Sequence, residues 1–496
     1  MARDHLDGER MQQSVTKELF ESKAAPPGQR VASREKGRGL GLALIFVLLE
    51  QRFAALLLIP AVVAGIVTAI ARGPWWLFLV VYALVPLVGI VMPVAYLVYR
   101  SYRHDAGPAN WEGVLAWSDP KVAQRWSGQK IPISIAYEAY LRGELEFKRD
   151  LQEVMLRRNQ FFRFCFTWTD IKFYWGQFFA QHLTHSRRAD REDIAPVYDR
   201  GNDFYGWFLG PSMVYTSAVF QDENETLEDG QRRKLDIICQ SVQMQQGDRH
   251  LDIGCGWGAL LAHAAKNYGS VSTGITLAKE QADFGRSLAT EQGVSDRIRI
   301  VVDDYRTLEG RFDKITCVEM AEHVGIKNFQ VFLRQAYELL EDDGIFYLQI
   351  AGLRRAWQFE DLVWGLFMAK YIFPGADASC PLGFVVSHAE RAGFEVHRVE
   401  NAGAHYAVTI AKWYDNWKRN EAAIVARYGV YWFKLWSLFL AWSVQIGGQG
   451  SSALFMLTLT KNLKNDQSTV PPEDRYQVPF SRRKRWIGPK PIATQQ

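Results

Sequence analysis

Two long runs without charged residues stand out near the start of the chain. They cover residues 53–71 and 75–99, and a turn containing Arg72, Gly73 and Pro74 separates them. A helix needs about 20 apolar residues to cross the hydrocarbon core of a bilayer. The pattern therefore predicts a transmembrane hairpin over residues 39–104, and buried helices of a soluble domain are the alternative.

Basic residues flank this hairpin on both sides. Several Lys and Arg residues precede the first run, and Arg100 and Arg103 follow the second. Because basic flanks favour the cytosolic side, both ends of the hairpin and the rest of the chain are expected to face the cytosol. A cleaved signal peptide is disfavoured, since the runs begin late, are long and come as a pair.

From about residue 231 to residue 394, short apolar strands alternate with helices. The predicted strands cover residues 249–253, 271–275, 299–302, 314–318 and 344–350. This alternation is typical of an α/β fold in which helices cover both faces of a parallel sheet. Ligands of such sheets bind at the carboxyl ends of the strands.

The remaining segments differ in character. We expect a flexible tail over residues 1–38, an aromatic-rich membrane-proximal linker over 105–191, a domain containing the α/β sheet over 192–463 and a basic tail over 464–496. The aromatic stretch 161–179 fits either a headgroup boundary or an ordinary core. The apolar stretch 431–446 fits core packing better than a path for a lipid tail.

Composition narrows the function. The chain has 496 residues, of which 48% are hydrophobic and 23% charged, as in folded proteins. A formal net charge of +4 is small for this length, so no nucleic-acid partner is predicted. The five cysteines are widely spaced and include no CxxC pair, which favours neither a disulfide framework nor a metal site.

A glycine-rich turn follows the first predicted strand. Asp252 ends the strand, Gly254, Gly256 and Gly258 follow, and a helix begins near Ala259. Glycines at this turn allow a ligand to approach the backbone beside a helix N-terminus. The third glycine comes sooner than in the dinucleotide fingerprint. This spacing resembles the S-adenosylmethionine loop of Rossmann-like methyltransferases, and a tight turn without a ligand is the alternative.

Several motifs occur in one order along the chain. They are the segments 198–205 and 208–217, LDIGCGWG at 251–258, GITLAKEQ at 274–281, DYR at 304–306 and EMAEHVG at 319–325. Over about residues 192–463 the chain resembles the cyclopropane fatty acid and mycolic acid synthase family. The N-terminal hairpin, the linker and the segments 349–379 and 405–410 are similar to the sphingolipid C9-methyltransferases of that family.

The resemblance implies a class I methyltransferase domain with S-adenosylmethionine as its cofactor. Residues at the strand ends would line the cofactor site, and residues before the first strand would close over it. The first group is Asp252, Gly254, Gly256, Gly258, Thr276, Leu277, Gln281, Asp304, Tyr305 and Arg306; the second is Tyr198, Tyr215, Thr216 and Ser217. Aromatic packing is the alternative role for Tyr198 and Tyr215.

The resemblance also implies the reaction, which is methylation of C9 at the Δ8 double bond of ceramide or glucosylceramide. The expected catalytic residues are Glu322, His323, Tyr406, Ser217 and Gln349. Glu322 and Tyr406 match residues that hold a bicarbonate ion acting as base, and a structural glutamate is the alternative for Glu322. Ser217 and Gln349 replace the family's Cys and His, which puts bicarbonate binding in question, although both side chains can donate hydrogen bonds.

The expected partners are a membrane sphingolipid and the bilayer itself, with the protein in the endoplasmic reticulum or Golgi. Two other functions remain open. One is cyclopropane synthesis on unsaturated phospholipid acyl chains. The other is a membrane scaffold without catalytic activity.

Overall fold

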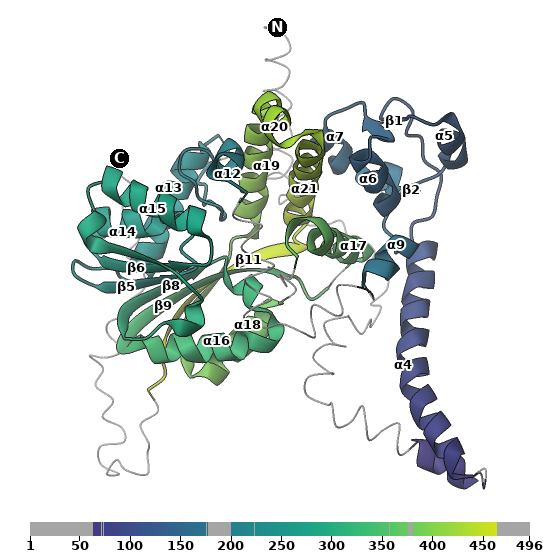
Figure 1. Cartoon of the computed structure of the whole chain (residues 1–496), viewed down its shortest axis with the longest axis horizontal. Helices are drawn as coiled ribbons and strands as arrows, with labels where there is room; N and C mark the ends of the chain where they lie inside the picture. Colours follow the sequence, from purple (N-terminus) through teal and green to yellow (C-terminus); the bar gives the residue numbers. More distant parts are fainter. Residues whose placement is uncertain are drawn as a thin grey trace, which may run out of the picture.

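The computed structural model describes residues 63–70, 72, 74–174, 176, 200–222, 224–356, 358–374 and 380–463 (Figure 1). Most of the first predicted membrane run, both predicted tails and Tyr198 lie outside these residues. The second run falls within α4 (Trp75–Arg103), which extends away from the rest of the chain in Figure 1. Among the described helices, none combines the length and the apolarity required to cross a membrane.

The described part of the chain is organised around a seven-stranded sheet with the order β10-β11-β9-β8-β5-β6-β7. Strand β11 runs antiparallel to both of its neighbours, and the other strands run parallel to one another. The bounds are β5 (Arg249–Ile253), β6 (Val271–Thr276), β7 (Ile298–Val302), β8 (Phe312–Val318), β9 (Leu340–Leu353), β10 (Phe394–Asn401) and β11 (Ser452–Lys461).

All five predicted strands are present, as β5 to β9, and they are parallel as predicted. The expectation of a wholly parallel sheet is wrong at one edge, where β11 lies between β9 and β10. Three helices separate β10 from β11 along the chain. The packing of these helices determines the direction in which the chain enters β11. No local pattern of side chains specifies that packing.

Helices cover both faces of the sheet. On one face lie α16 (Ile326–Leu339) and α18 (Leu382–Ala392), below the sheet in Figure 1. Helix α16 forms because its apolar residues recur every three or four positions, at 329, 332, 333 and 336, and all four are buried. The opposite face is covered by α13 (Leu227–Ser241), α14 (Ala259–Tyr268) and α15 (Lys279–Glu291).

A second hydrophobic core joins the N-terminal part of the chain to helices near its C-terminus. Phe161, Phe162 and Phe164 are buried in it, together with most of α21 (Val430–Gly448). The core-packing interpretation is therefore confirmed for these three aromatic residues and for α21, whereas Trp168 of the same stretch is 71% exposed. A buried ion pair between Arg158 and Glu360 fastens the two parts together, and Gln449 accepts a further bond from Arg158 at 2.8 Å.

Further described elements lie outside the seven-stranded sheet and the helices named above. They are β1 (Leu115–Trp117), α5 (Pro120–Trp126), β2 (Ile131–Pro132), α6 (Ile133–Leu141), β3 (Leu145–Phe147), α7 (Leu151–Leu156), α8 (Arg158–Phe161), β4 (Phe162–Arg163), α9 (Trp168–Phe173), α12 (Asn202–Leu209), η2 (Ser295–Arg297), η3 (Tyr305–Thr307), η4 (Ala321–Val324), α17 (Phe359–Phe367), the π-helical turn η5 (Met368–Ile372), α19 (Gly403–Arg419) and α20 (Glu421–Tyr428).

Candidate active site

The backbone conformation of the turn after β5 favours glycine. Gly254, Gly256 and Gly258 have φ angles of 84°, 50° and 79°, in the left-handed region that other residues avoid. A Cβ atom on Gly254 would lie 2.4 Å from Cγ of Met320, whereas one on Gly256 would meet nothing within 4 Å. The turn is thus packed on one side and open on the other, directly before the N-terminus of α14 at Ala259.

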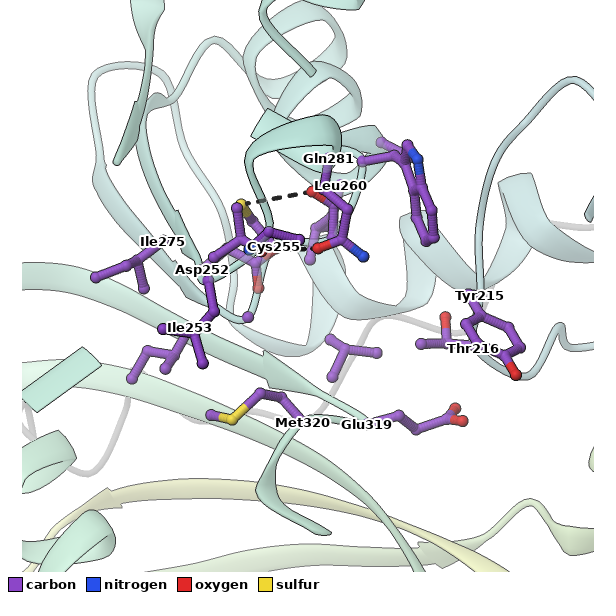
Figure 2. Close-up of a pocket in the computed structure, with 18 of the residues that line it drawn as sticks. Tyr215, Thr216, Asp252, Ile253, Cys255, Leu260, Ile275, Gln281, Glu319 and Met320 are labelled. Carbon is purple, nitrogen blue, oxygen red and sulfur yellow. Dashed lines mark hydrogen bonds between the residues drawn. The ribbon is translucent and has the colours of Figure 1, made fainter. Parts of the chain in front are cut away.

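A cavity lies on the open side of this turn, at the carboxyl ends of β5, β6, β7 and β8 (Figure 2). Among the residues predicted for the site, its walls contain Tyr215, Thr216, Asp252, Gly254, Gly256, Thr276, Leu277, Gln281, Asp304, Tyr305, Arg306 and His323. Ser217, Gly258, Glu322, Gln349 and Tyr406 lie outside the walls. Most of the candidate cofactor residues predicted from the sequence therefore line one cavity. Most of the candidate catalytic residues do not line it.

Short-range hydrogen bonds hold the strand ends in place. Thr276 Oγ1 donates to Gln281 Oε1 at 2.7 Å, which fixes the side-chain amide of Gln281 at the cavity wall. The carboxylate of Asp304 accepts from the backbone N–H of Arg306 at 2.9 Å and pairs with its guanidinium at 2.6 Å. These side chains are therefore ordered before any ligand binds, as a preorganised site requires.

The loop that carries Tyr215 and Thr216 is tied to α13. Gln231 Nε2 donates to the carbonyl of Thr216 at 2.8 Å, and Lys234 Nζ donates to the Thr216 hydroxyl. The ring of Tyr215 packs between those of Tyr205 and Trp413, at centroid distances of 5.5 and 5.4 Å. These neighbours hold the ring of Tyr215 at the cavity wall.

Three charged residues meet below this loop, and two of them, Lys234 and Glu319, were absent from the sequence prediction. Lys234 is buried, and burial lowers its pKa to about 8 while the charges of Glu319 and Asp252 oppose that shift. Burial raises the pKa of Asp252 to about 6, against a 2.6 Å hydrogen bond from Thr316 Oγ1 and the charge of Lys234. The cluster balances one cation against two carboxylates in a region shielded from water.

Glu319 follows β8 directly and lines the cavity beside Tyr215 and Thr216 (Figure 2). Its φ angle is 51°, a left-handed conformation that a residue with a side chain rarely adopts and that is often found at functional sites. Its Oε1 atom accepts two hydrogen bonds, from the backbone N–H of Ser217 at 2.9 Å and from Gln349 Nε2 at 2.7 Å. Burial raises the pKa of Glu319, while these two bonds and Lys234 counteract the shift.

Glu322 and His323 lie in η4, one turn beyond Glu319. Glu322 Oε1 accepts from the backbone N–H of Ala351 at 2.6 Å, and Oε2 has no hydrogen-bond partner among the described residues. Burial, and then the charge of Glu319, raises the pKa of Glu322 to about 8. The ring of His323 packs edge-on against Phe373, 6.1 Å away. Glu322 is thus a neutral acid over most of the physiological pH range.

The strand order, the single antiparallel strand and the glycine turn beside the cavity define a class I S-adenosylmethionine-dependent methyltransferase. The family model of mycolic acid cyclopropane synthetase matches residues 185–456, which is more than half of the chain. The chain therefore belongs to that family.

Three comparisons describe its place in the family. The sphingolipid C9-methyltransferase of Komagataella phaffii is 44% identical over 76% of this chain and 80% of its own length. Sphingolipid C9-methyltransferase 2 of Gibberella zeae is 47% identical over 74% of this chain and 69% of its own. A mycolic acid cyclopropane synthase solved with S-adenosylhomocysteine and CTAB aligns with a TM-score of 0.53 at 25% identity, covering 55% of this chain and 98% of that one.

Proposed function

We propose that this protein transfers the methyl group of S-adenosylmethionine to C9 of the Δ8-unsaturated sphingoid base of ceramide or glucosylceramide. The observation that carries the proposal is the similarity to sphingolipid C9-methyltransferases, which extends well beyond the 185–456 family match. The cavity at the strand ends supports it, because it has a glycine turn for the methyl donor and the aromatic ring of Tyr215 for a hydrocarbon substrate.

The donor supplies a methyl group activated on a positively charged sulfur. The open face at Gly256 and the helix N-terminus at Ala259 fit its polar end, and Gln281 and Asp304 fit its remaining polar groups. Methyl transfer to an alkene creates positive charge on the lipid chain. An aromatic face such as that of Tyr215 stabilises a cation by about 0.5–2 kcal/mol, and nearby carboxylates add direct charge attraction.

The test is a labelling experiment with the purified full chain, labelled S-adenosylmethionine and vesicles that contain both a Δ8-unsaturated ceramide and an unsaturated phospholipid. Label in the long-chain base, as a 9-methyl branch, is the expected result. Label only in the ester-linked acyl fraction would instead support a cyclopropane synthase, the second candidate, which the solved cyclopropane synthase favours. Failure to bind S-adenosylmethionine in calorimetry would favour a scaffold without catalytic activity.

We further propose that a hairpin formed by residues 53–99 attaches the protein to the endoplasmic reticulum or Golgi membrane, with the domain 192–463 in the cytosol. The described side chains of α4 support this attachment. Trp75 is 76% exposed, Met92 and Tyr96 are 62% exposed each, and the helix ends in Arg100 and Arg103. So many exposed apolar side chains on one helix are typical of a surface covered by lipid or protein.

Membrane attachment and orientation can be tested separately. Carbonate extraction of microsomes should leave the full chain in the pellet, whereas a chain that starts at residue 105 should be released. A tag at the C-terminus should be degraded by protease added to sealed microsomes. Complete protection of the tag would refute the cytosolic orientation.

A further inference from the structure

Two of the residues that the family resemblance assigns to bicarbonate already have another partner. The side chains of Ser217 and Gln349 are both fully buried. The Ser217 hydroxyl donates to the carbonyl of Ala218 at 3.0 Å, so it is not directed at a ligand. The backbone N–H of Ser217 and the amide of Gln349 both donate to one oxygen of Glu319. The residues present therefore do not fit a separate bicarbonate ion, because a carboxylate of the chain fills the position that these donors define.

From this arrangement, and resting on the proposed function, we propose that Glu319 is the base of the reaction and replaces bicarbonate. Glu319 lines the cavity beside Tyr215 and Thr216, so its carboxylate adjoins the space where the lipid chain must meet the methyl donor (Figure 2). The strained φ angle of 51° is the local cost of turning this side chain into the cavity, and the two converging hydrogen bonds help to offset it.

The second carboxylate of the site is less suited to the role. Backbone N–H groups, including that of Ala351, favour the ionised form of Glu322, but burial and then the charge of Glu319 outweigh them and raise its pKa to about 8. Glu319 receives two hydrogen bonds and the attraction of Lys234, and all three favour its ionised form. Two neighbouring carboxylates in a shielded site rarely ionise together. Glu319 therefore keeps the negative charge and Glu322 keeps the proton.

The chemical step balances with Glu319 as the acceptor. As the methyl–sulfur bond breaks, the electron pair of the alkene forms the new bond between C9 and the methyl carbon, and C8 becomes positive. Glu319 takes a proton from C9, and the pair of that C–H bond becomes the new C8–C9 double bond. The product is a methyl-branched alkene, because the proton leaves the chain carbon and the new methyl group keeps all of its hydrogens. A base that is part of the polypeptide is consistent with loss of the proton from C9 alone. Its position along the lipid chain is fixed, whereas a free ion can change its position.

The test compares rates with and without bicarbonate. The purified full chain is assayed in buffer freed of carbon dioxide, with and without added millimolar bicarbonate, using labelled S-adenosylmethionine and the mixed vesicles described above. The wild-type rate should be the same in both buffers. Glu319→Gln should lower kcat by about 10²–10⁴-fold, the usual contribution of a general base. The exposed residue Glu338 on α16 provides the matched control, and Glu338→Gln should retain the wild-type rate.

Calorimetry with S-adenosylmethionine shows whether each variant is folded. Glu319→Ala leaves a space between the same two donors, so formate or bicarbonate should restore part of its rate, which loss of a merely structural residue would not allow. A wild-type rate that falls without bicarbonate and recovers on its addition would overturn the proposal, as would full activity of folded Glu319→Gln. Label in acyl chains instead of the sphingoid base would refute only the proposed substrate, because the bicarbonate comparison still identifies the base.

Discussion

The raised pKa of Glu322 predicts that the protein loses stability as the pH rises. Burial and the charge of Glu319 raise this pKa from its ordinary value of 4.5 to about 8. Between these two values the folded state keeps a proton that the unfolded chain has lost, so folding becomes less favourable as protons become scarce. The contribution is fully present below pH 4.5 and has been lost at about pH 8.

Glu322→Gln removes this titration while its side-chain oxygen can still accept the hydrogen bond from the N–H of Ala351. A group that is protonated in the folded state and ionised in the unfolded state over this window changes the free energy of unfolding by about 1.4 kcal/mol per pH unit. From about pH 5.5 to about pH 7.5 the variant should therefore gain about 3 kcal/mol relative to wild type. Asp252 and Glu319 titrate in both proteins, so the difference isolates Glu322.

The assay is thermal unfolding of the full chain in detergent, followed by tryptophan fluorescence at matched scan rates across this pH range. The Tm of Glu322→Gln minus that of wild type should increase steadily with pH, and Glu338→Gln should follow wild type throughout. Parallel curves for Glu322→Gln and wild type would refute the assignment of a neutral, buried acid at this position.

Two further predictions concern the glycine turn and the buried ion pair. Gly254→Ala should weaken S-adenosylmethionine binding in calorimetry at least about tenfold, because the new Cβ combines a left-handed φ with a clash against Met320. Gly247→Ala has a similar φ of 83° but nothing within 4 Å, so it should leave the affinity unchanged, and equal losses in both variants would contradict the role of the turn. Glu360→Gln should lower the free energy of unfolding by about 3–5 kcal/mol, because Arg158 keeps its buried charge without the carboxylate that neutralises it. An unchanged Tm would contradict this second prediction.

The strands that build the cofactor side of the cavity could be read from the sequence because each one is a short apolar run that ends in a polar turn. Observed β5 has the predicted bounds, β6 and β7 are one residue longer than predicted, β8 is two residues longer, and β9 (Leu340–Leu353) is twice as long as the predicted run 344–350. Strand β11 could not be placed in this way. Its apolar run follows α21, and only the packing of α19 and α21 brings it between β9 and β10.

Lys234 was missed because it follows Arg232 and Arg233, and a run of three basic residues usually marks a solvated helix face. The helical period contains the missing signal. Leu227, Gln231, Lys234 and Ile238 recur at intervals of three or four positions, and all four are buried. A lysine on the apolar stripe of a helix requires a buried anion nearby. The position of Lys234 on the buried face of α13 could therefore have predicted the charged cluster.

The role of Glu319 was not predicted from the sequence for a different reason. The sequence placed it at the end of a strand, but the family resemblance directed attention to Glu322, three residues further on. The contacts that distinguish the two carboxylates come from Ser217 and Gln349, which are 102 and 30 positions away along the chain. No local pattern reports a φ angle of 51° or two donors that converge from distant segments.

The location of these donors couples the proposed base to the closing of the site. Ser217 lies in the same loop as Tyr215 and Thr216, which cover the cavity, and Lys234 holds that loop through the Thr216 hydroxyl. If the loop opens, Glu319 loses the Ser217 hydrogen bond, which is one of the interactions that favour its ionised form. An ionised base is therefore best stabilised when the loop is closed, water is excluded and the lipid is held against the methyl donor. In this arrangement the base is most fully ionised at the moment when a positively charged lipid chain must be prevented from reacting with water.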